Sequence, residues 1–279
     1  MTHTWIKKLN LFIIFLFLTL TSLWVLYPLV YVVSAAFSPG TGIASLTLVP
    51  FGDGVTLDHF TYLFQDTLYV TWFRNSFIIA ISTSAGTVFV ASLGAYVFSR
   101  FNFTFKKGMM LTMLILQIFP SMVGMIAIYV ILNRLGGLDT LWGLILVYLA
   151  GNIPYNTWLV KSYMDTIPKS LDEAARIDGA SHFRIFRQIV LPIAKPIIIF
   201  LSITSFTMPW MDFIFPKLVL RSADKQTVAL GLFSFVTDKK NQFTDFAAGA
   251  LLIAIPFVIF FVITQKMIIT SLGGAAVKE

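Results

Sequence analysis

The sequence predicts an all-α polytopic membrane protein with six transmembrane helices. Only 12% of its 279 residues are charged and 57% are hydrophobic, whereas roughly 25% of the residues of a soluble domain are charged. The apolar residues form runs that a bilayer accepts on every face of a helix, rather than the periodic pattern of a soluble core. These observations exclude an ordinary soluble domain.

The residue types that usually carry metal or redox chemistry are scarce. The chain contains no cysteine, and His3, His59 and His182 lie far apart in the sequence. Disulfides and thiolate metal sites are therefore excluded, and no histidine metal site is expected. The formal charge of +7 is compatible with nucleic-acid binding, but the uneven distribution of charge between the loops explains it better.

Six stretches are long and apolar enough to cross a bilayer, which takes about 20 residues of helix. They are residues 11–36, 72–99, 108–132, 141–163, 190–215 and 246–269. The first stretch follows Lys7 and Lys8 and so has features of a signal peptide. Its apolar run is longer than that of a signal peptide, which favours a retained anchor helix.

Lysines and arginines are distributed unevenly between the two sides of this arrangement. The side with both termini holds thirteen of the twenty, together with five of the thirteen acidic residues. Because Lys and Arg concentrate on the cytoplasmic side, we expect both termini in the cytoplasm of a cell (plasma or inner) membrane, with the chain in contact with lipid. The outer loops, 38–69 and 216–244, are long enough to touch a soluble partner, or they simply connect helices.

The predicted spans carry no obvious source of energy. No Asp, Glu, Lys, Arg or His occurs in residues 75–99, 108–133 or 141–160, whereas proton-driven and many ion-driven carriers place ionisable groups inside the membrane. The sequence also lacks a G-x-x-x-x-G-K-[ST] loop that would hold nucleotide phosphates. If the chain moves a solute against a gradient, the energy must come from another protein.

Neutral polar and aromatic side chains within the spans are candidates for lining a pathway. They suit a polyhydroxylated solute, whose hydroxyls need hydrogen bonds and whose C–H faces pack on aromatic rings. The alternative is that these side chains only hold helices together. The candidates are Gln117, Asn152, Asn156, Ser205 and Trp210.

A charged hairpin, "SLDEAARIDGASHFRIFRQIVLP", separates the fourth and fifth spans. Ser170 and Glu173 have the spacing of a capping box, so a helix is expected to begin at Leu171 and to end at Gly179. Ser181 is expected to cap a second helix that leads into the fifth span. Such a hairpin is either a lever joined to the membrane or a solvated connection.

This hairpin resembles the EAA signature of the permease subunits of binding-protein-dependent ABC importers. The signature reads E-A-A-x-x-x-G and, after nine residues, I-x-L-P. The sequence matches it at Glu173, Ala174, Ala175, Gly179, Ile189, Leu191 and Pro192, and Asp178 completes a D-G pair. The segments "IFPSMVGMIAIYVILNRLGGLDTLWGLIL" and "TDFAAGALLIAIP" are similar to the maltose and maltodextrin branch of that family.

The resemblance implies a division of the chain and a role for the hairpin. Residues 1–70 would form an anchor helix and an external loop, and residues 71–279 the permease domain with its EAA loop at 164–192. The matched residues, Glu173, Ala174, Ala175, Asp178, Gly179, Ile189, Leu191 and Pro192, would form a cytoplasmic coupling helix and its connection to the fifth span. They would dock on an ATPase, so the permease would be no enzyme itself.

The resemblance also implies partners and a solute. The expected partners are a second permease, two ATPase subunits that bind ATP and Mg²⁺, and an extracellular sugar-binding protein; no cofactor is expected on this chain. The last external loop would contact the binding protein through Thr237, Asp238, Lys239, Lys240, Asn241 and Gln242. The expected solute is maltose or maltodextrin, with another oligosaccharide or glycerol phosphate as alternatives, and a stand-alone channel or secondary carrier as a rival class.

Overall fold

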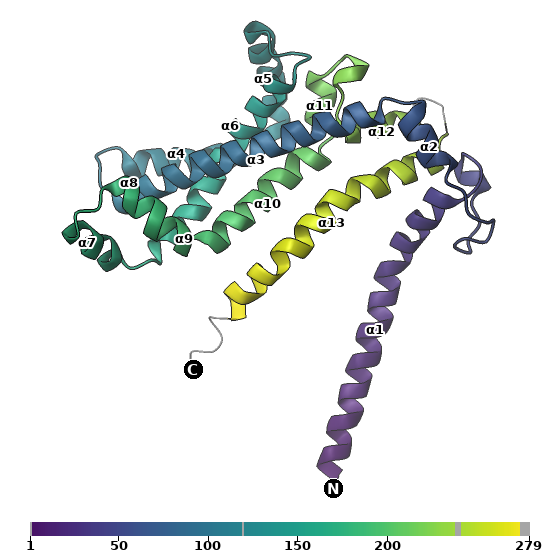
Figure 1. Cartoon of the computed structure of the whole chain (residues 1–279), viewed down its shortest axis with the longest axis horizontal. Coiled ribbons are helices and arrows are strands. Elements are labelled where there is room, and N and C mark those ends of the chain that lie inside the picture. The colour runs from purple at the N-terminus through teal and green to yellow at the C-terminus, as the bar shows by residue number, and fades with distance from the viewer. Residues whose placement is uncertain (1, 119, 238–240, 274–279) are drawn as a thin grey trace. The chain divides into compact units, whose positions relative to one another are not determined.

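The computed structural model describes residues 2–118, 120–237 and 241–273, which form helices and short helical turns without any strand. Figure 1 labels the helices along the chain. The long ones are α1 (Thr2–Phe37), α3 (Tyr69–Arg100), α4 (Lys106–Ile118), α5 (Ser121–Leu135), α6 (Leu141–Asp165), α10 (Lys195–Met211) and α13 (Phe243–Gly273). The short ones are α2 (Asp58–Gln65), α7 (Lys169–Ile177), α8 (His182–Ile185), α9 (Leu191–Ile193), α11 (Ile214–Val219) and α12 (Val228–Thr237), with turns η1 (Ile43–Ser45), η2 (Phe186–Val190) and η3 (Ala223–Lys225).

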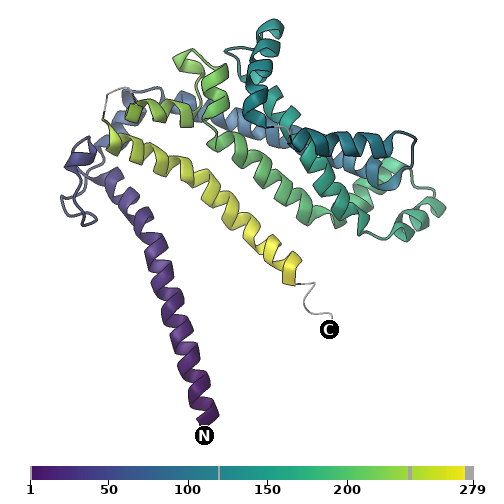
Figure 2. The same ribbon diagram turned by 180° about the vertical axis from the view of Figure 1, so that it is seen from behind.

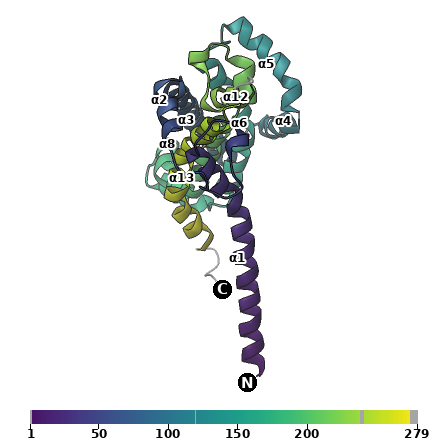
Figure 3. The same ribbon diagram turned by 90° about the vertical axis from the view of Figure 1, so that its right-hand side faces the viewer.

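The predicted all-α membrane fold is confirmed, and the spans can be compared one by one. By length and composition, α1, α3 and α13 could each cross a membrane. Two further helix pairs qualify if a bent pair counts as one span: α4 with α5, bent by 107°, and residues 182–193 with α10, bent by 80°. Figure 3 shows α5 turning away from α4. The helix α6 coincides with the predicted fourth span but does not meet the same criterion, so the count of six stays a prediction.

The chain divides into two units with a break between Tyr69 and Val70, and each unit takes in a second segment from the C-terminal part. The division into an N-terminal part and a permease domain at residue 70 stays a prediction. One unit consists of Met1–Tyr69 and Leu232–Ile255. In it, the apolar length of α1 is exposed on all sides, as a lipid-facing helix would be, and burial begins only at Ser34. A hydrogen bond from the Thr244 hydroxyl to the Gly40 carbonyl, 2.8 Å long, ties the start of α13 to the loop after α1.

The other unit consists of Val70–Gly231 and Pro256–Glu279 and contains α3 from Val70 onward. Small residues let neighbouring helices approach α3 closely: a Cβ atom at Gly94 would lie 3.3 Å from Thr157 of α6. The Ser84 hydroxyl donates a 2.9 Å hydrogen bond to the Ser202 carbonyl of α10. Figure 2 shows α3 and α10 side by side from behind, as Figure 1 does from the front.

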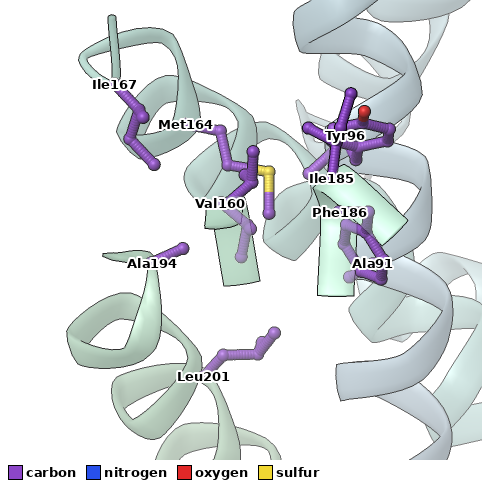
Figure 4. Packing of buried hydrophobic residues seen from close by; sticks show 11 residues of the cluster. Ala91, Tyr96, Val160, Met164, Ile167, Ile185, Phe186, Ala194 and Leu201 are labelled. Carbon is purple, nitrogen blue, oxygen red and sulfur yellow. The ribbon is translucent and has the colours of Figure 1, made fainter. Parts of the chain in front are cut away.

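A hydrophobic core lies where the charged hairpin joins the spans. Figure 4 shows its buried side chains converging from α3, α6, the hairpin and α10. Complete burial of one large apolar side chain stabilises a fold by roughly 1.5–3 kcal/mol relative to leaving that side chain in water. The core residues are Ala91, Ala95, Tyr96, Val160, Met164, Ile167, Ile185, Phe186, Val190, Ala194 and Leu201. The hairpin is therefore packed against the membrane helices rather than extended into solvent.

Candidate functional site

The short helix α7 presents one side to the protein and the other to solvent. Asp172 is buried, and Ala175, three residues on, packs partly against the hydrophobic core. Glu173, Ala174 and Ile177 are exposed, Ile177 to 88%. Glu173 and Ala174 lie four and three residues before Ile177, the spacings that place side chains on one helical face, and we name these three residues the exposed face of α7.

The start of α7 differs from the sequence prediction. The helix begins at Lys169 after Pro168, and the structure shows no side-chain hydrogen bond capping it. The predicted capping box of Ser170 and Glu173 is therefore wrong, because proline immediately before the helix fixes a starting conformation two residues earlier. Ser170 then lies within the first turn, and the Glu173 side chain is left free to face outward.

The end of α7 agrees with the prediction. Gly179 has a φ of +79°, in the left-handed region that favours glycine. Its amide donates to the Arg176 carbonyl at 3.0 Å, and the Ala180 amide donates to the Ala175 carbonyl at 2.9 Å. This pair of bonds is the Schellman arrangement that closes a helix. In this chain, the glycine of the EAA pattern is therefore explained by the left-handed backbone conformation that ends α7.

The base of α7 is held by a buried ion pair. The Arg100 side chain is 5% exposed, and its Nε donates to Asp172 Oδ2 at 2.8 Å. The same guanidinium donates to the Met164 carbonyl at 3.0 Å, the Ile167 carbonyl at 3.1 Å and the Ser99 hydroxyl at 3.2 Å. One arginine therefore connects the ends of α3 and α6 with the first turn of α7.

A second carboxylate lies at the end of α6. Asp165 accepts hydrogen bonds from Ser99 Oγ at 2.7 Å and Lys161 Nζ at 2.5 Å. Burial alone would raise its pKa, but these two bonds and the charges of Lys161 and Lys106 outweigh that effect and lower the pKa below its usual range. Asp165 therefore stays ionised beside the cationic groups of this region.

The second half of the hairpin leads into α10. The Ser181 hydroxyl accepts a 3.3 Å hydrogen bond from the Arg184 amide, as its predicted role as a cap requires. The residues that follow include a π-helical turn, η2, within which Phe186 and Val190 are buried. Phe183, three residues before Phe186, is 66% exposed. Of the matched residues here, Ile189 and Leu191 are partly buried against the core, and Pro192 is exposed.

A groove lies between α7 and the second half of the hairpin. It measures about 200 Å³ and is open to solvent. Its walls combine apolar and charged groups, so it can receive a side chain of either kind from a partner. The lining residues are Ala175, Asp178, Ala180, Arg184, Ile185, Gln188 and Ile189.

The candidates for a solute pathway have different environments. Gln117 lines a larger groove of about 690 Å³, together with Tyr148 and Met208. Asn156 is buried and donates to the Asn152 carbonyl at 2.8 Å, within its own helix. The Asn152 side-chain nitrogen is buried and has no hydrogen-bond partner within the described part of the chain.

The remaining two pathway candidates have structural contacts. The Ser205 hydroxyl donates to the Leu201 carbonyl one turn earlier in α10. Trp210 is fully buried and packs on Phe73 and Phe206, with ring centroids 5.2 Å and 5.5 Å away. Both residues therefore take part in helix packing in this structure, whereas Gln117 lines a groove and Asn152 has a side-chain nitrogen without a partner among the described residues.

The predicted outer contact loop is partly described. Thr237 and Asn241 are exposed, while Asp238, Lys239 and Lys240 lie outside the described residues. Gln242 donates to the Tyr62 hydroxyl at 3.3 Å and lines a polar cleft of about 340 Å³. At the bottom of this cleft, His59 Nδ1 lies 2.7 Å from Asp245 Oδ1, and His59 Nε2 lies 2.8 Å from the Ser38 carbonyl oxygen.

The all-helical fold with candidate membrane spans and a short exposed helix is compatible with a membrane-spanning transporter subunit. The family model for the binding-protein-dependent transport system inner membrane component matches residues 86–271. The chain belongs to this family, and it is an integral membrane protein.

Three similar proteins give this assignment detail. The maltodextrin transport system permease protein MdxG of Bacillus subtilis is 41% identical over 273 residues, covering 98% of each chain. The galactooligosaccharides transport system permease protein GanQ of the same organism is 39% identical and covers 98% of this chain and 97% of its own. A solved bacterial ABC transporter that imports alginate shares the fold, with a TM-score of 0.77 at 22% identity over 93% of this chain and 96% of that chain.

Several residues of the site could not be found from the sequence. Arg100 and Asp172 are 72 positions apart, and His59 and Asp245 are 186 apart. Local spacing gives no information about such pairs. The one available signal was that Asp172 lies in the first turn of a helix, where an acidic residue is favoured by the helix dipole.

Proposed function

We propose that this chain is a membrane permease subunit of an ATP-driven importer for oligosaccharides of the maltodextrin type. Its partners would be a second permease, two ATPase subunits that hold ATP and Mg²⁺, and an extracellular sugar-binding protein. The chain would carry out no covalent chemistry. It would contribute part of a pathway that opens alternately to the two sides of the membrane.

The observation that carries this proposal is the exposed face of α7. Glu173, Ala174 and Ile177 point outward from a helix whose other side is packed against the core. A short helix anchored in this way can transmit a movement of its partner into the spans. The groove beside it, lined by Asp178 and Arg184 among others, offers a further contact for the ATPase. The solute class rests on the similarity to MdxG over nearly the whole chain.

A charge reversal on the exposed face tests the coupling role. We expect Glu173→Arg to leave insertion and folding unchanged, because the side chain is exposed, and to reduce uptake at least about five-fold, the lower end of typical coupling energies. Uptake and ATP hydrolysis are measured in proteoliposomes that contain all the subunits. Lys107→Glu, an exposed charge reversal at the start of α4, is the matched control. Unchanged uptake in Glu173→Arg would remove the coupling role of α7.

A galactooligosaccharide is the second candidate solute, because GanQ is almost as similar in sequence to this chain as MdxG is. The two candidates are separated by competition between labelled maltotriose and labelled galactotriose in the same vesicles. Preferential uptake of maltotriose supports the proposal, and preferential uptake of galactotriose replaces it. Uptake by the purified chain without any ATPase would instead support a stand-alone carrier.

A further inference from the structure

We propose that Arg100 is a positioning residue that joins the base of α7 to the ends of α3 and α6, so that a displacement of α7 moves these membrane helices together. This inference rests on the proposed function, because it concerns how a movement of α7 reaches the spans. It assigns a role to a residue that lies far from the exposed face and outside the EAA pattern.

The hydrogen bonds of Arg100 define the joint. A guanidinium has five N–H donors in a rigid plane, and four hydrogen bonds of Arg100 reach Ser99, Met164, Ile167 and Asp172. Met164 belongs to the last turn of α6, and Ile167 follows that helix. Asp172 belongs to the first turn of α7. A single side chain from the last residue of α3 therefore contacts both of the other helices.

The electrostatics of the two helix ends make an arginine suitable here. The last carbonyls of a helix have no partner within that helix, and a cation is favourable beside them. The N-terminal turn of a helix favours a negative charge. Arg100 supplies the cation to the end of α6, and Asp172 supplies the anion to the start of α7. A lysine has the charge but not the planar fork, so it could not reproduce these bonds.

Burial shows that this role is indirect. The Arg100 side chain is 5% exposed and the Asp172 side chain 12% exposed, so a partner that binds the exposed face of α7 would not touch Arg100. Any effect of Arg100 on coupling must therefore act through the position of α7. The hydrophobic core beside it, with Met164 and Ile167 on one side, holds the same elements together (Figure 4).

The test compares four variants in proteoliposomes with all the subunits: Arg100→Met, Arg100→Lys, Arg100→Met with Asp172→Asn, and Arg134→Met. The last is the control, an exposed arginine on α5. The quantity measured is the amount of labelled maltotriose imported per ATP hydrolysed by assembled complex, or of labelled galactotriose if the wild-type complex prefers it. Assembly is measured separately by co-purification, and Glu173→Arg is included in parallel.

We expect both single Arg100 variants to lower the import per ATP by about five-fold or more, whereas Arg134→Met stays within about two-fold of wild type. Asp172→Asn removes the unpaired buried charge left by Arg100→Met, so the double variant recovers assembly. It does not recover coupling, because the bonds to the carbonyls of Met164 and Ile167 remain absent.

A purely structural role predicts a different result. Coupling would then recover together with assembly in the double variant, or Arg100→Lys would equal wild type, and either result would overturn the proposal. If Arg100→Met fails to assemble, the import per ATP of the double variant and of Arg100→Lys distinguishes the positioning role from the purely structural one. If Glu173→Arg imports as much solute per ATP as the wild type, the proposed function fails. If Glu173→Arg is impaired but the Arg100 variants are not, only this inference fails.

Discussion

Two buried ion pairs, one in each unit, connect distant parts of the chain in different ways. Arg100 and Asp172 are 2.8 Å apart, and His59 and Asp245 are 2.7 Å apart. All four side chains are no more than 12% exposed. Both pairs place an acidic residue in the first turn of a helix, α7 or α13, where the helix dipole favours it.

The difference lies in how much of the surrounding structure each basic side chain contacts. The guanidinium of Arg100 makes four hydrogen bonds, one of them to Asp172. The imidazole of His59 contacts two oxygen atoms, one of Asp245 and the carbonyl oxygen of Ser38. Because arginine always carries its charge in proteins, the loss of Asp172 leaves a buried charge without its partner.

The largest expected effect is the loss of Asp172. Asp172→Ala leaves the Arg100 charge buried without its partner, which costs about 3–5 kcal/mol of unfolding free energy. Unfolding of the purified protein in detergent measures this cost. Asp178→Ala, an exposed acidic residue on the same hairpin, is the control and should change the stability by less than about 0.5 kcal/mol. Equal effects of the two substitutions would show that the buried pair contributes no more to the free energy of unfolding than an exposed acidic residue does.

A smaller effect is expected from the loss of Asp245. Asp245→Ala should cost about 1–3 kcal/mol, the penalty for one unsatisfied buried group, because His59 keeps its contact with the Ser38 carbonyl oxygen. Asp245→Asn retains an acceptor and should recover part of that stability. The same unfolding assay applies. A cost equal to that of Asp172→Ala would contradict the distinction between the two pairs.

The smallest effect concerns a third carboxylate, Asp139, which is only partly buried. Burial raises its pKa, but hydrogen bonds from the Ser222 hydroxyl, from the amides of Ser222 and Arg221, and from Lys225 lower the pKa well below its usual value. A lowered folded-state pKa means that these bonds stabilise the protein above the unfolded-state value. That contribution is lost as the pH falls through the folded-state pKa.

Asp139→Asn tests this pH dependence. Near neutral pH the substitution should cost about 1–2 kcal/mol, and the difference from wild type should shrink as the pH falls below the ordinary aspartate range, near 3.8. Unfolding measured at a series of pH values gives the comparison. A difference that stays constant with pH would show that ionisation of Asp139 does not contribute.

The turn chemistry of the hairpin could be predicted from the sequence because it depends on neighbouring residues. Gly179 ends α7 in the left-handed conformation, and Ser181 caps α8, as expected. The start of α7 was predicted two residues too late, since the capping box competes there with Pro168. The pattern of apolar runs likewise predicted an all-helical membrane protein, although it did not show the break between α4 and α5.

The sequence by itself determined the class of the protein and the place of the hairpin, because apolar runs, turn residues and the EAA pattern are local properties. Only the tertiary structure decided which side of α7 faces inward, with Asp172 buried and Glu173 exposed. It also brought Arg100 to the ends of two other helices. The physical reason is that a helix of two and a half turns has several equivalent faces, and the burial of one of them is set by partners far away in the chain.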